Sequence, residues 1–235
     1  MHIDVWTDVA CPWCYLGIRH LRSALAAFEH AEEVEVVAHA YFLDPELSER
    51  SELSEVEYLM EHKGITREQV DQAHERLSSL GSAEGFTFDF DHLVVVPTSN
   101  AHRVVAAARE HDLAAGTETG ADTTQLRLLE AIDRAHFELG LDIADADVLI
   151  GCAQDVGMEA EDVVAALADE QRASEVFSDY QIAVQMGIDS VPTLLVDRTF
   201  VVQGAQPVTA LANALGTAWE QSHSVGADGT GATPR

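Results

Sequence analysis

Lysine is almost absent from this 235-residue sequence, and basic residues of either kind are few. Lys63 is the only lysine, and 13 Lys and Arg stand against 41 Asp and Glu, a formal net charge of −28. Such a chain repels phosphates, which excludes binding to nucleic acid or to an anionic membrane through its general field. The balance is typical of halophilic proteins, although arginine-favouring codon bias in a GC-rich genome would also produce it. We expect a halophile whose structure is lost below molar salt.

Cysteines and long apolar runs are also scarce. Three cysteines are too few for a disulfide scaffold. A zinc site would need two ligands beyond a CxxC pair, and the 11 histidines form no paired set beside the cysteines, so no metal is expected. Cys152 is expected to pack in the core. The acidic start lacks a secretory pattern, and no uncharged stretch reaches the roughly 18–20 residues that span a bilayer. We expect a soluble, cytoplasmic protein.

Hydrophobic periodicity predicts an α/β fold. Residues 1–43 have the pattern of a β-α-β unit, with strands at 3–7 and 34–43 and a helix opened by Pro12. Helical periodicity then continues to about residue 187, and a capping box at Thr66–Gln69 marks one helix start. A strand at 191–196, a second at 199–203 and a helix at 206–220 follow.

This order predicts a four-stranded mixed sheet built from βαβ and ββα halves, with an inserted helical block. The expected divisions are 1–43 for the first half, 44–187 for the helical insertion domain and 188–221 for the second half. The tail, 222–235, is rich in Gly, Ala and Thr, and we expect it to be disordered.

The sequence Cys11-Pro12-Trp13-Cys14 lies where the first strand gives way to the first helix. Residues i and i+3 at a helix start face the same way, so their sulfurs can bond with little backbone movement. Free amides and the helix dipole stabilise a thiolate at the helix N-terminus. The pattern predicts Cys11 as the nucleophile and Cys14 as the thiol that resolves a mixed disulfide.

Residues 6–17, WTDVACPWCYLG, resemble the active-site segment of DsbA-family thioredoxin-like oxidoreductases, specifically the FrnE-like branch. FLDP at 42–45, NAHR at 100–103, GIDSVPT at 187–193 and GAQ at 204–206 agree in order along the chain. The resemblance covers residues 1 to about 217. It implies a thioredoxin fold with a large all-helical insertion and a redox-active CxxC.

The resemblance also assigns roles near the dithiol. It implies a cis bond between Val191 and Pro192, with the Val191 backbone free to pair with an extended substrate. A trans proline at the start of an edge strand is the ordinary alternative.

Further site residues are interpreted by position alone. Pro12 and Trp13 are expected to contact substrate, and Asn100 and His102 to line a groove between the two lobes. A histidine at a helix start is more often a local hydrogen-bonding residue. Asp8 could relay a proton or simply cap the next helix. Acidic side chains are expected on exposed helix faces of the insertion, away from the groove around Cys11.

The resulting hypothesis is a cytosolic thiol–disulfide oxidoreductase, monomeric or homodimeric, acting on protein or peptide substrates. It needs no cofactor beyond its own disulfide, with glutathione as a conceivable co-substrate. Reduction potentials in this fold span about 150 mV, so oxidant, reductant and isomerase all stay open.

Two alternative functions also stay open. One is a glutathione-dependent isomerase or transferase, related to the hydroxychromene-carboxylate isomerases and kappa-class transferases. Those relatives have serine at the first CxxC position, where this chain has Cys11. The other is a redox-regulated holdase that uses the helical groove.

Overall fold

A four-stranded mixed sheet brings the two ends of the chain together in the computed structural model, which describes residues 1–224. The strand order is β2-β1-β3-β4. β1 (His2–Thr7) runs parallel to β2 (Glu35–Ala40) and antiparallel to β3 (Thr193–Val196), and β3 pairs with the antiparallel strand β4 (Phe200–Gln203). The predicted thioredoxin-type sheet is confirmed.

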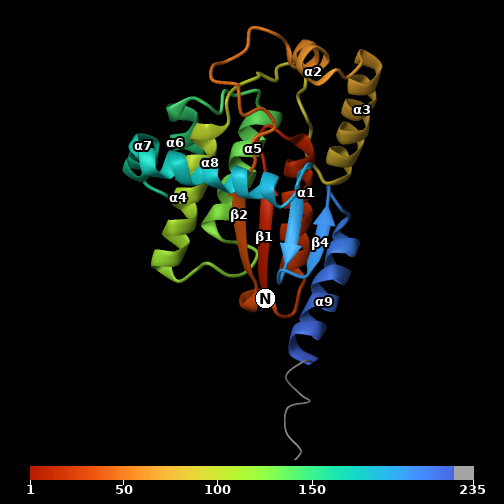
Figure 1. The fold of residues 1–235 in the computed structure, drawn as a ribbon, viewed down its shortest axis with the longest axis vertical. Helices are drawn as coiled ribbons and strands as arrows, with labels where there is room; N and C mark the ends of the chain where they lie inside the picture. The colour runs from red at the N-terminus through yellow and green to blue at the C-terminus, as the bar shows by residue number, and fades with distance from the viewer. Residues whose placement is uncertain (225–235) are drawn as a thin grey trace, which may run out of the picture.

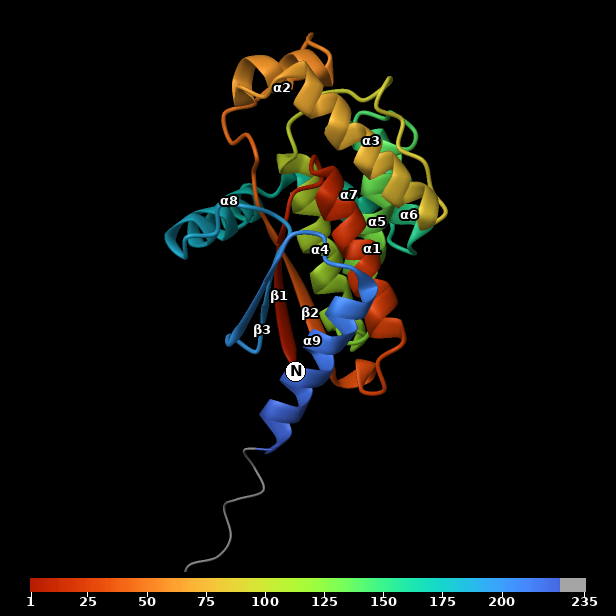
Figure 2. The same ribbon diagram turned by 90° about the vertical axis from the view of Figure 1, so that its right-hand side faces the viewer.

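Helices cover the sheet on both faces. α1 (Pro12–Ala26) and α9 (Val208–Ser224) lie on one face, while α8 (Glu170–Gln185) crosses the other (Figures 1 and 2). Side-chain alternation along β1 explains this layering, because Ile3 and Val5 enter the main core whereas Trp6 joins a second cluster. The second cluster contains both cysteines of the CxxC motif, Cys11 and Cys14.

The helical insertion follows β2 and ends with α8. Its other helices are α2 (Glu55–Lys63), α3 (Arg67–Ala83), α4 (Ser99–Ala115), α5 (Thr124–Phe137), α6 (Ala146–Asp155) and α7 (Ala160–Ala168). A short 3-10 turn, Ala31–Glu33, precedes β2. α2 and α3 lie together beyond the N-terminal end of α1 (Figures 1 and 2). We call α2 and α3 the roof.

Local capping residues fix where the roof helices begin. The predicted capping box on α3 is present, since the Thr66 side chain accepts from the Gln69 amide and Gln69 accepts from the Thr66 amide. α2 begins with the same arrangement between Ser54 and Glu57. Each box satisfies amide groups that the first helical turn leaves unpaired.

The end of the chain corrects one expectation. α9 continues through Ser224, so the tail does not begin at residue 222. Residues 225–235, where the rest of the expected disordered tail falls, lie outside the described residues. Within residues 1–224, no helix has the length and apolar character needed to cross a membrane.

Candidate active site

Cys11 occupies the cap position of α1, directly after the loop that leaves β1. Pro12 takes the first helical position, where no amide hydrogen is needed. The Cys11 carbonyl accepts hydrogen bonds from the amides of Cys14 (2.9 Å) and Tyr15 (3.2 Å). The strand-to-helix junction predicted for the motif is therefore present, with Cys11 at the N-terminus of the helix.

The two cysteines differ in access. Both are free thiols; Cys11 is 5% exposed and faces a cavity, whereas Cys14 is completely buried. Burial, together with a hydrogen bond to Cys11 and the charge of that residue, raises the pKa of Cys14 well above its ordinary value. The Thr7 side chain and the Asp8 backbone act weakly in the opposite direction. Cys14 thus holds its proton while Cys11 faces incoming molecules.

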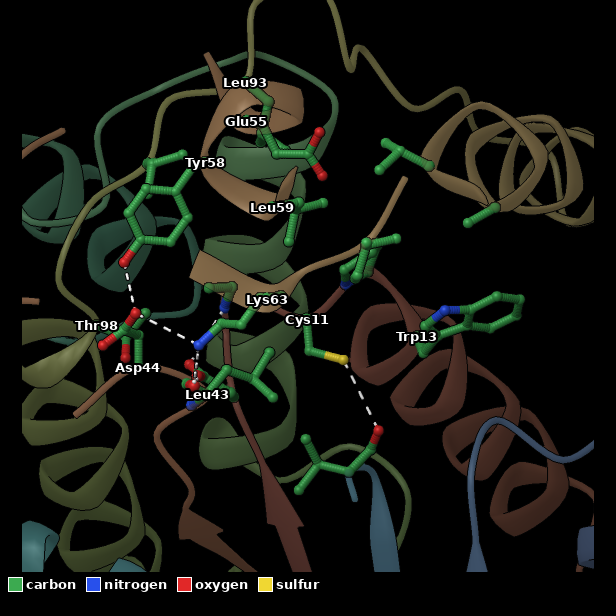
Figure 3. Close-up of a pocket in the computed structure, with 18 of the residues that line it drawn as sticks. Cys11, Trp13, Leu43, Asp44, Glu55, Tyr58, Leu59, Lys63, Leu93 and Thr98 are labelled. Atoms are coloured by element: carbon green, nitrogen blue, oxygen red, sulfur yellow. Dashed lines mark hydrogen bonds and ion pairs between the residues drawn. The ribbon is translucent and has the colours of Figure 1, made fainter. Parts of the chain in front are cut away.

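The loop before β3 closes the other side of the dithiol. The Val191–Pro192 peptide bond is cis, as the resemblance implies. The Cys11 thiol lies 3.8 Å from the Val191 carbonyl oxygen, to which it donates (Figure 3). Gly17 of α1 faces the Pro192 ring so closely that a Cβ there would lie 2.7 Å from Pro192 Cγ. Helix α1 and this loop are packed without spare room.

Cys11 opens into a cavity of about 450 Å³ between α1 and the roof. Asp8, Pro12, Trp13 and Val191, four of the residues singled out in the sequence, line it. Aliphatic side chains form much of the remaining wall: Leu47, Leu59, Ile65, Val70, Leu77 and Leu93. A space of this size and character is typical of a ligand pocket.

Polar contacts attach the roof to the end of β2 (Figure 3). The Lys63 ammonium donates to the Leu43 carbonyl oxygen (2.8 Å) and lies 3.4 Å from the Asp44 carboxylate. The Tyr58 hydroxyl donates to the same carboxylate at 2.5 Å. Burial would raise the pKa of Asp44, but the hydrogen bond from Tyr58 and the charge of Lys63 hold it below its ordinary value.

The expectation that acidic groups spare the groove is wrong. Asp8, Asp44, Glu55 and Asp189 all line the cavity. Glu55 lies 3.2 Å from His74, which is also in the wall. These four acidic residues come from segments far apart in the chain. The pattern of charges along a single helix therefore does not show that they line one cavity.

The Asp8 side chain does not cap α1, but it is held by other hydrogen bonds. Its side chain is 2% exposed and accepts hydrogen bonds from the amides of Leu43 (2.7 Å) and Ala10 (3.3 Å). The third neighbour is His102 Nε2, at 3.3 Å. Asp8 therefore joins the loop before Cys11 to the end of β2 and to α4.

Two residues expected at the groove lie elsewhere. His102 is buried behind Asp8 and is not among the residues that line the cavity. The Asn100 side chain donates to the Ala144 carbonyl oxygen, also away from the cavity. Both contacts hold α4 in place, which is the local hydrogen-bonding role typical of helix-start residues.

Two buried titratable groups of α5 lie near the dithiol. Burial lowers the pKa of His136, a cavity-lining residue, to about 4, so its ring is neutral at pH 7. Burial and the charges of Cys11 and Asp8 raise the pKa of Asp133 well above its ordinary value. Asp133 is 1% exposed, and the raised pKa favours the protonated form of its carboxyl group. Sequence patterning places both on an apolar helix face and does not mark them.

Cys152 stands apart from this chemistry. It packs in the main core, as predicted, and its thiol lies 3.6 Å from the Ala131 carbonyl oxygen. Burial raises the pKa of its thiol to about 11. Across the described part of the chain, no three His, Cys, Asp or Glu side chains are grouped to hold a metal ion.

The contribution of the roof to the cavity is not predicted from the sequence, although two features of α2 indicate it. Ser54 and Glu57 have the spacing of a capping box and mark the start of α2. Lys63, the only lysine of the chain, ends that helix and contacts Asp44. The only lysine in a chain this acidic is a reason to look for its partner.

Known proteins share this arrangement. The DSBA-like thioredoxin domain family matches residues 2–216. A probable DsbA oxidoreductase from Streptomyces coelicolor is 31% identical, with a TM-score of 0.80 over 100% of this chain and 94% of its own. Among curated proteins, none matches significantly.

Two more distant structures share the fold. The cytosolic disulfide reductase DsbM from Pseudomonas aeruginosa is 19% identical, with a TM-score of 0.67 over 94% of this chain and 100% of its own. A 2-hydroxychromene-2-carboxylate isomerase is 14% identical, with a TM-score of 0.64 over 96% of this chain and 99% of its own. From the family match and the sheet, helix and cysteine arrangement described above, this chain belongs to the DSBA-like thioredoxin domain family.

Proposed function

We propose that the protein is a thiol–disulfide oxidoreductase that works through the Cys11–Cys14 dithiol. The observation that carries the proposal is the asymmetry of the two sulfurs. Cys11 caps a helix at the floor of a cavity, and Cys14 is sealed one turn further along the same helix. One thiol can meet a substrate, and the other can be reached only from Cys11.

The reaction divides between these two groups. In the reducing direction, the Cys11 thiolate attacks one sulfur of a substrate disulfide and forms a mixed disulfide, and the other substrate sulfur leaves and takes a proton. Cys14 then loses its proton and attacks Cys11, which forms the Cys11–Cys14 disulfide and releases the second substrate thiol. Two electrons pass from the dithiol to the substrate, and the reverse sequence oxidises a dithiol substrate.

Helix α1 supplies the electrostatics of the first step. Its free amides and dipole favour a thiolate at the cap position. The Val191 carbonyl beside the sulfur supports a further role, in which the backbone of this loop aligns an extended substrate strand. Pro12 and Trp13 would contact the same substrate from the helix side.

The two cysteines favour redox chemistry over the glutathione-dependent isomerase alternative. A transferase or isomerase that activates a bound thiol has no need of a second buried cysteine. The proposal requires no bound cofactor, because the redox equivalents are carried by the two sulfurs, and a thiol from solution completes the cycle. We place the reaction in the cytoplasm, where reduced thiols are abundant.

Insulin reduction by the full chain tests the proposal. We expect Cys11→Ser and Cys14→Ser each to abolish turnover, while Cys152→Ala, which removes the remaining cysteine from the core, keeps wild-type turnover. If Cys11→Ser and Cys14→Ser both retain wild-type turnover, disulfide exchange is not the function. A glutathione-dependent isomerisation that survives Cys14→Ser would instead support the isomerase alternative.

A further inference from the structure

The cavity above Cys11 is acidic as well as apolar. Four carboxylates line it, from Asp8, Asp44, Glu55 and Asp189, whereas Lys63 is the one Lys or Arg among the lining residues of the described chain. His136, also in the wall, is neutral at pH 7 because burial lowers its pKa to about 4. The fixed charge that a bound molecule meets is therefore negative.

The lysine in the wall is already engaged by the protein itself. Its ammonium is held by the Leu43 carbonyl at 2.8 Å and by the Asp44 carboxylate at 3.4 Å. The guanidinium of Arg76 lies over the Trp13 ring, 5.1 Å from its centre, and Arg76 is not a lining residue. The only Lys or Arg among the described lining residues is therefore paired with a carboxylate of the wall, and the other basic side chain beside a wall carboxylate, His74, is paired with Glu55.

Two of the carboxylates face the place where a substrate would lie. Asp189 is exposed and precedes Val191, the loop residue that contacts Cys11, by two positions. Glu55 lines the cavity from the roof, and its Oε1 shares a hydrogen bond with His74 Nε2 at 3.3 Å, whereas its buried Oε2, 3.2 Å from the same ring, has no hydrogen bond. A carboxylate with spare acceptor capacity in an apolar wall favours a cationic or hydrogen-bond-donating group opposite it.

We propose that the cavity selects a cysteine-bearing peptide segment that is neutral or basic and has a bulky apolar side chain beside the cysteine. This inference rests on the thiol–disulfide exchange proposed above. The apolar side chain fills the space between Leu59, Val70 and Leu77, while the cysteine reaches Cys11. Acidic thiols are disfavoured, including glutathione, which carries more carboxylates than ammonium groups, because like charges repel.

The sharpest test measures reduction of the oxidised protein by short thiols of different charge. We would use N-acetylated, C-amidated tripeptides with cysteine between two leucines, alanines, lysines or glutamates, together with glutathione. The peptide thiolate attacks Cys11 Sγ and displaces Cys14, and a second peptide thiol attacks the mixed disulfide, giving peptide disulfide and the protein dithiol. Dividing each rate by that thiol's rate with 2-hydroxyethyl disulfide removes differences in intrinsic reactivity.

We expect the normalised rates of the lysine and leucine peptides to exceed those of the glutamate peptide and glutathione by about tenfold or more at the lowest salt concentration at which circular dichroism shows the protein to be folded. Salt added above that concentration should reduce the difference between the lysine and glutamate peptides, because the added ions screen the cavity charges. The leucine peptide should also react faster than the alanine peptide at every salt concentration.

Matched variants locate the effect in the cavity. Asp189→Asn removes one wall charge, and Asp44→Asn also releases Lys63, so each should raise the rate with the glutamate peptide severalfold. Glu161→Gln removes the same charge from an exposed position of α7, a helix that contributes no lining residue, and should change nothing.

Each outcome bears on one of the two proposals. Equal normalised rates for the lysine and glutamate peptides would overturn the inference and leave disulfide exchange standing. An effect of Glu161→Gln as large as that of Asp189→Asn would also overturn it, because the net charge of the whole protein would then explain the preference. Failure of every thiol to reduce the Cys11–Cys14 disulfide would overturn the proposed function itself.

Discussion

The floor of the cavity, formed by helix α1 and the Val191–Pro192 loop, is built differently from the roof, α2 and α3. Helix α1, which carries the dithiol, has 15 residues, of which nine are buried. The roof helices bury far less: α2 buries only Tyr58, and α3 buries Val70, Leu77 and Gly81. Polar contacts through Asp44 supplement this small apolar interface. The comparison suggests that the floor determines the chemistry, and that the weakly packed roof determines which molecules reach it.

The largest effect on stability is expected at Gly17, where α1 packs most closely against the Pro192 loop. Gly17→Ala would place a methyl group 2.7 Å from Pro192 Cγ, so α1 and the loop beside Cys11 must separate. We expect the free energy of unfolding to fall by about 1–3 kcal/mol and turnover to fall with it. Chemical denaturation and insulin reduction measure the two effects.

A second helical glycine provides the control. Gly216 of α9 has open space around its Cβ position, so Gly216→Ala should raise the free energy of unfolding by about 0.5–1 kcal/mol. If both substitutions have the same effect, the tight contact between α1 and the Pro192 loop is not a constraint on the floor.

A smaller, pH-dependent effect is expected on the opposite face of the sheet. His39 of β2 lies 2.8 Å from Asp4 and 3.2 Å from Asp179 of α8. Burial would lower the pKa of His39, but hydrogen bonds to Asp179 and Asp4 and their charges raise it to about 9. The folded-state pKa of His39 exceeds the ordinary value of about 6.5. The stabilisation that protonated His39 provides is therefore complete below pH 6.5 and is lost as the pH rises through 9.

We expect this attachment of α8 to contribute on the order of 1–2 kcal/mol. Urea denaturation at pH 6, 7 and 8 measures it, below the range in which unfolding would also ionise the buried thiols of Cys14 and Cys152, whose pKa values burial raises. His39→Gln should remove most of the fall in stability between these pH values. His92→Gln, at an exposed histidine paired with Asp89, should change the fall far less. A wild-type stability that does not decrease from pH 6 to 8 would contradict the assignment.

The smallest effect on stability is expected at the roof. Lys63→Met keeps most of the aliphatic side chain but removes the contacts of the ammonium with Leu43 and Asp44. Since the Lys63 side chain is 33% exposed, the free energy of unfolding should fall by less than about 1 kcal/mol. KM for insulin should change while kcat stays nearly constant. A large fall in kcat without a change in KM would mean that the roof takes part in the chemistry.

The floor could be predicted from the sequence because its signals are local. The CxxC spacing, Pro12 at the first helical position and the alternating residues of β1 each depend on a few adjacent residues. Resemblance added the Val191–Pro192 loop, which no local pattern joins to Cys11 across 180 residues. The family match and the sheet confirm the predicted family and fold.

The roof could not be predicted in the same way. That Asp44 and Lys63 meet in the wall of the cavity, or that His102 lies against Asp8, depends on how separate segments pack. A periodic pattern shows which face of a helix is buried but not what it is buried against. The expected requirement for molar salt stays a prediction, since it concerns the charge of the whole surface.

The most direct test of the central claim is to identify the cysteine that forms the mixed disulfide. Cys14→Ser, mixed with a peptide disulfide, should accumulate one peptide adduct per chain, and peptide mapping by mass spectrometry should place it on Cys11. Cys11→Ser should form no adduct on Cys14 at a comparable rate, because that thiol is completely buried. Rapid adduct formation on Cys14, or none on Cys11, would contradict the assignment of Cys11 as the nucleophile.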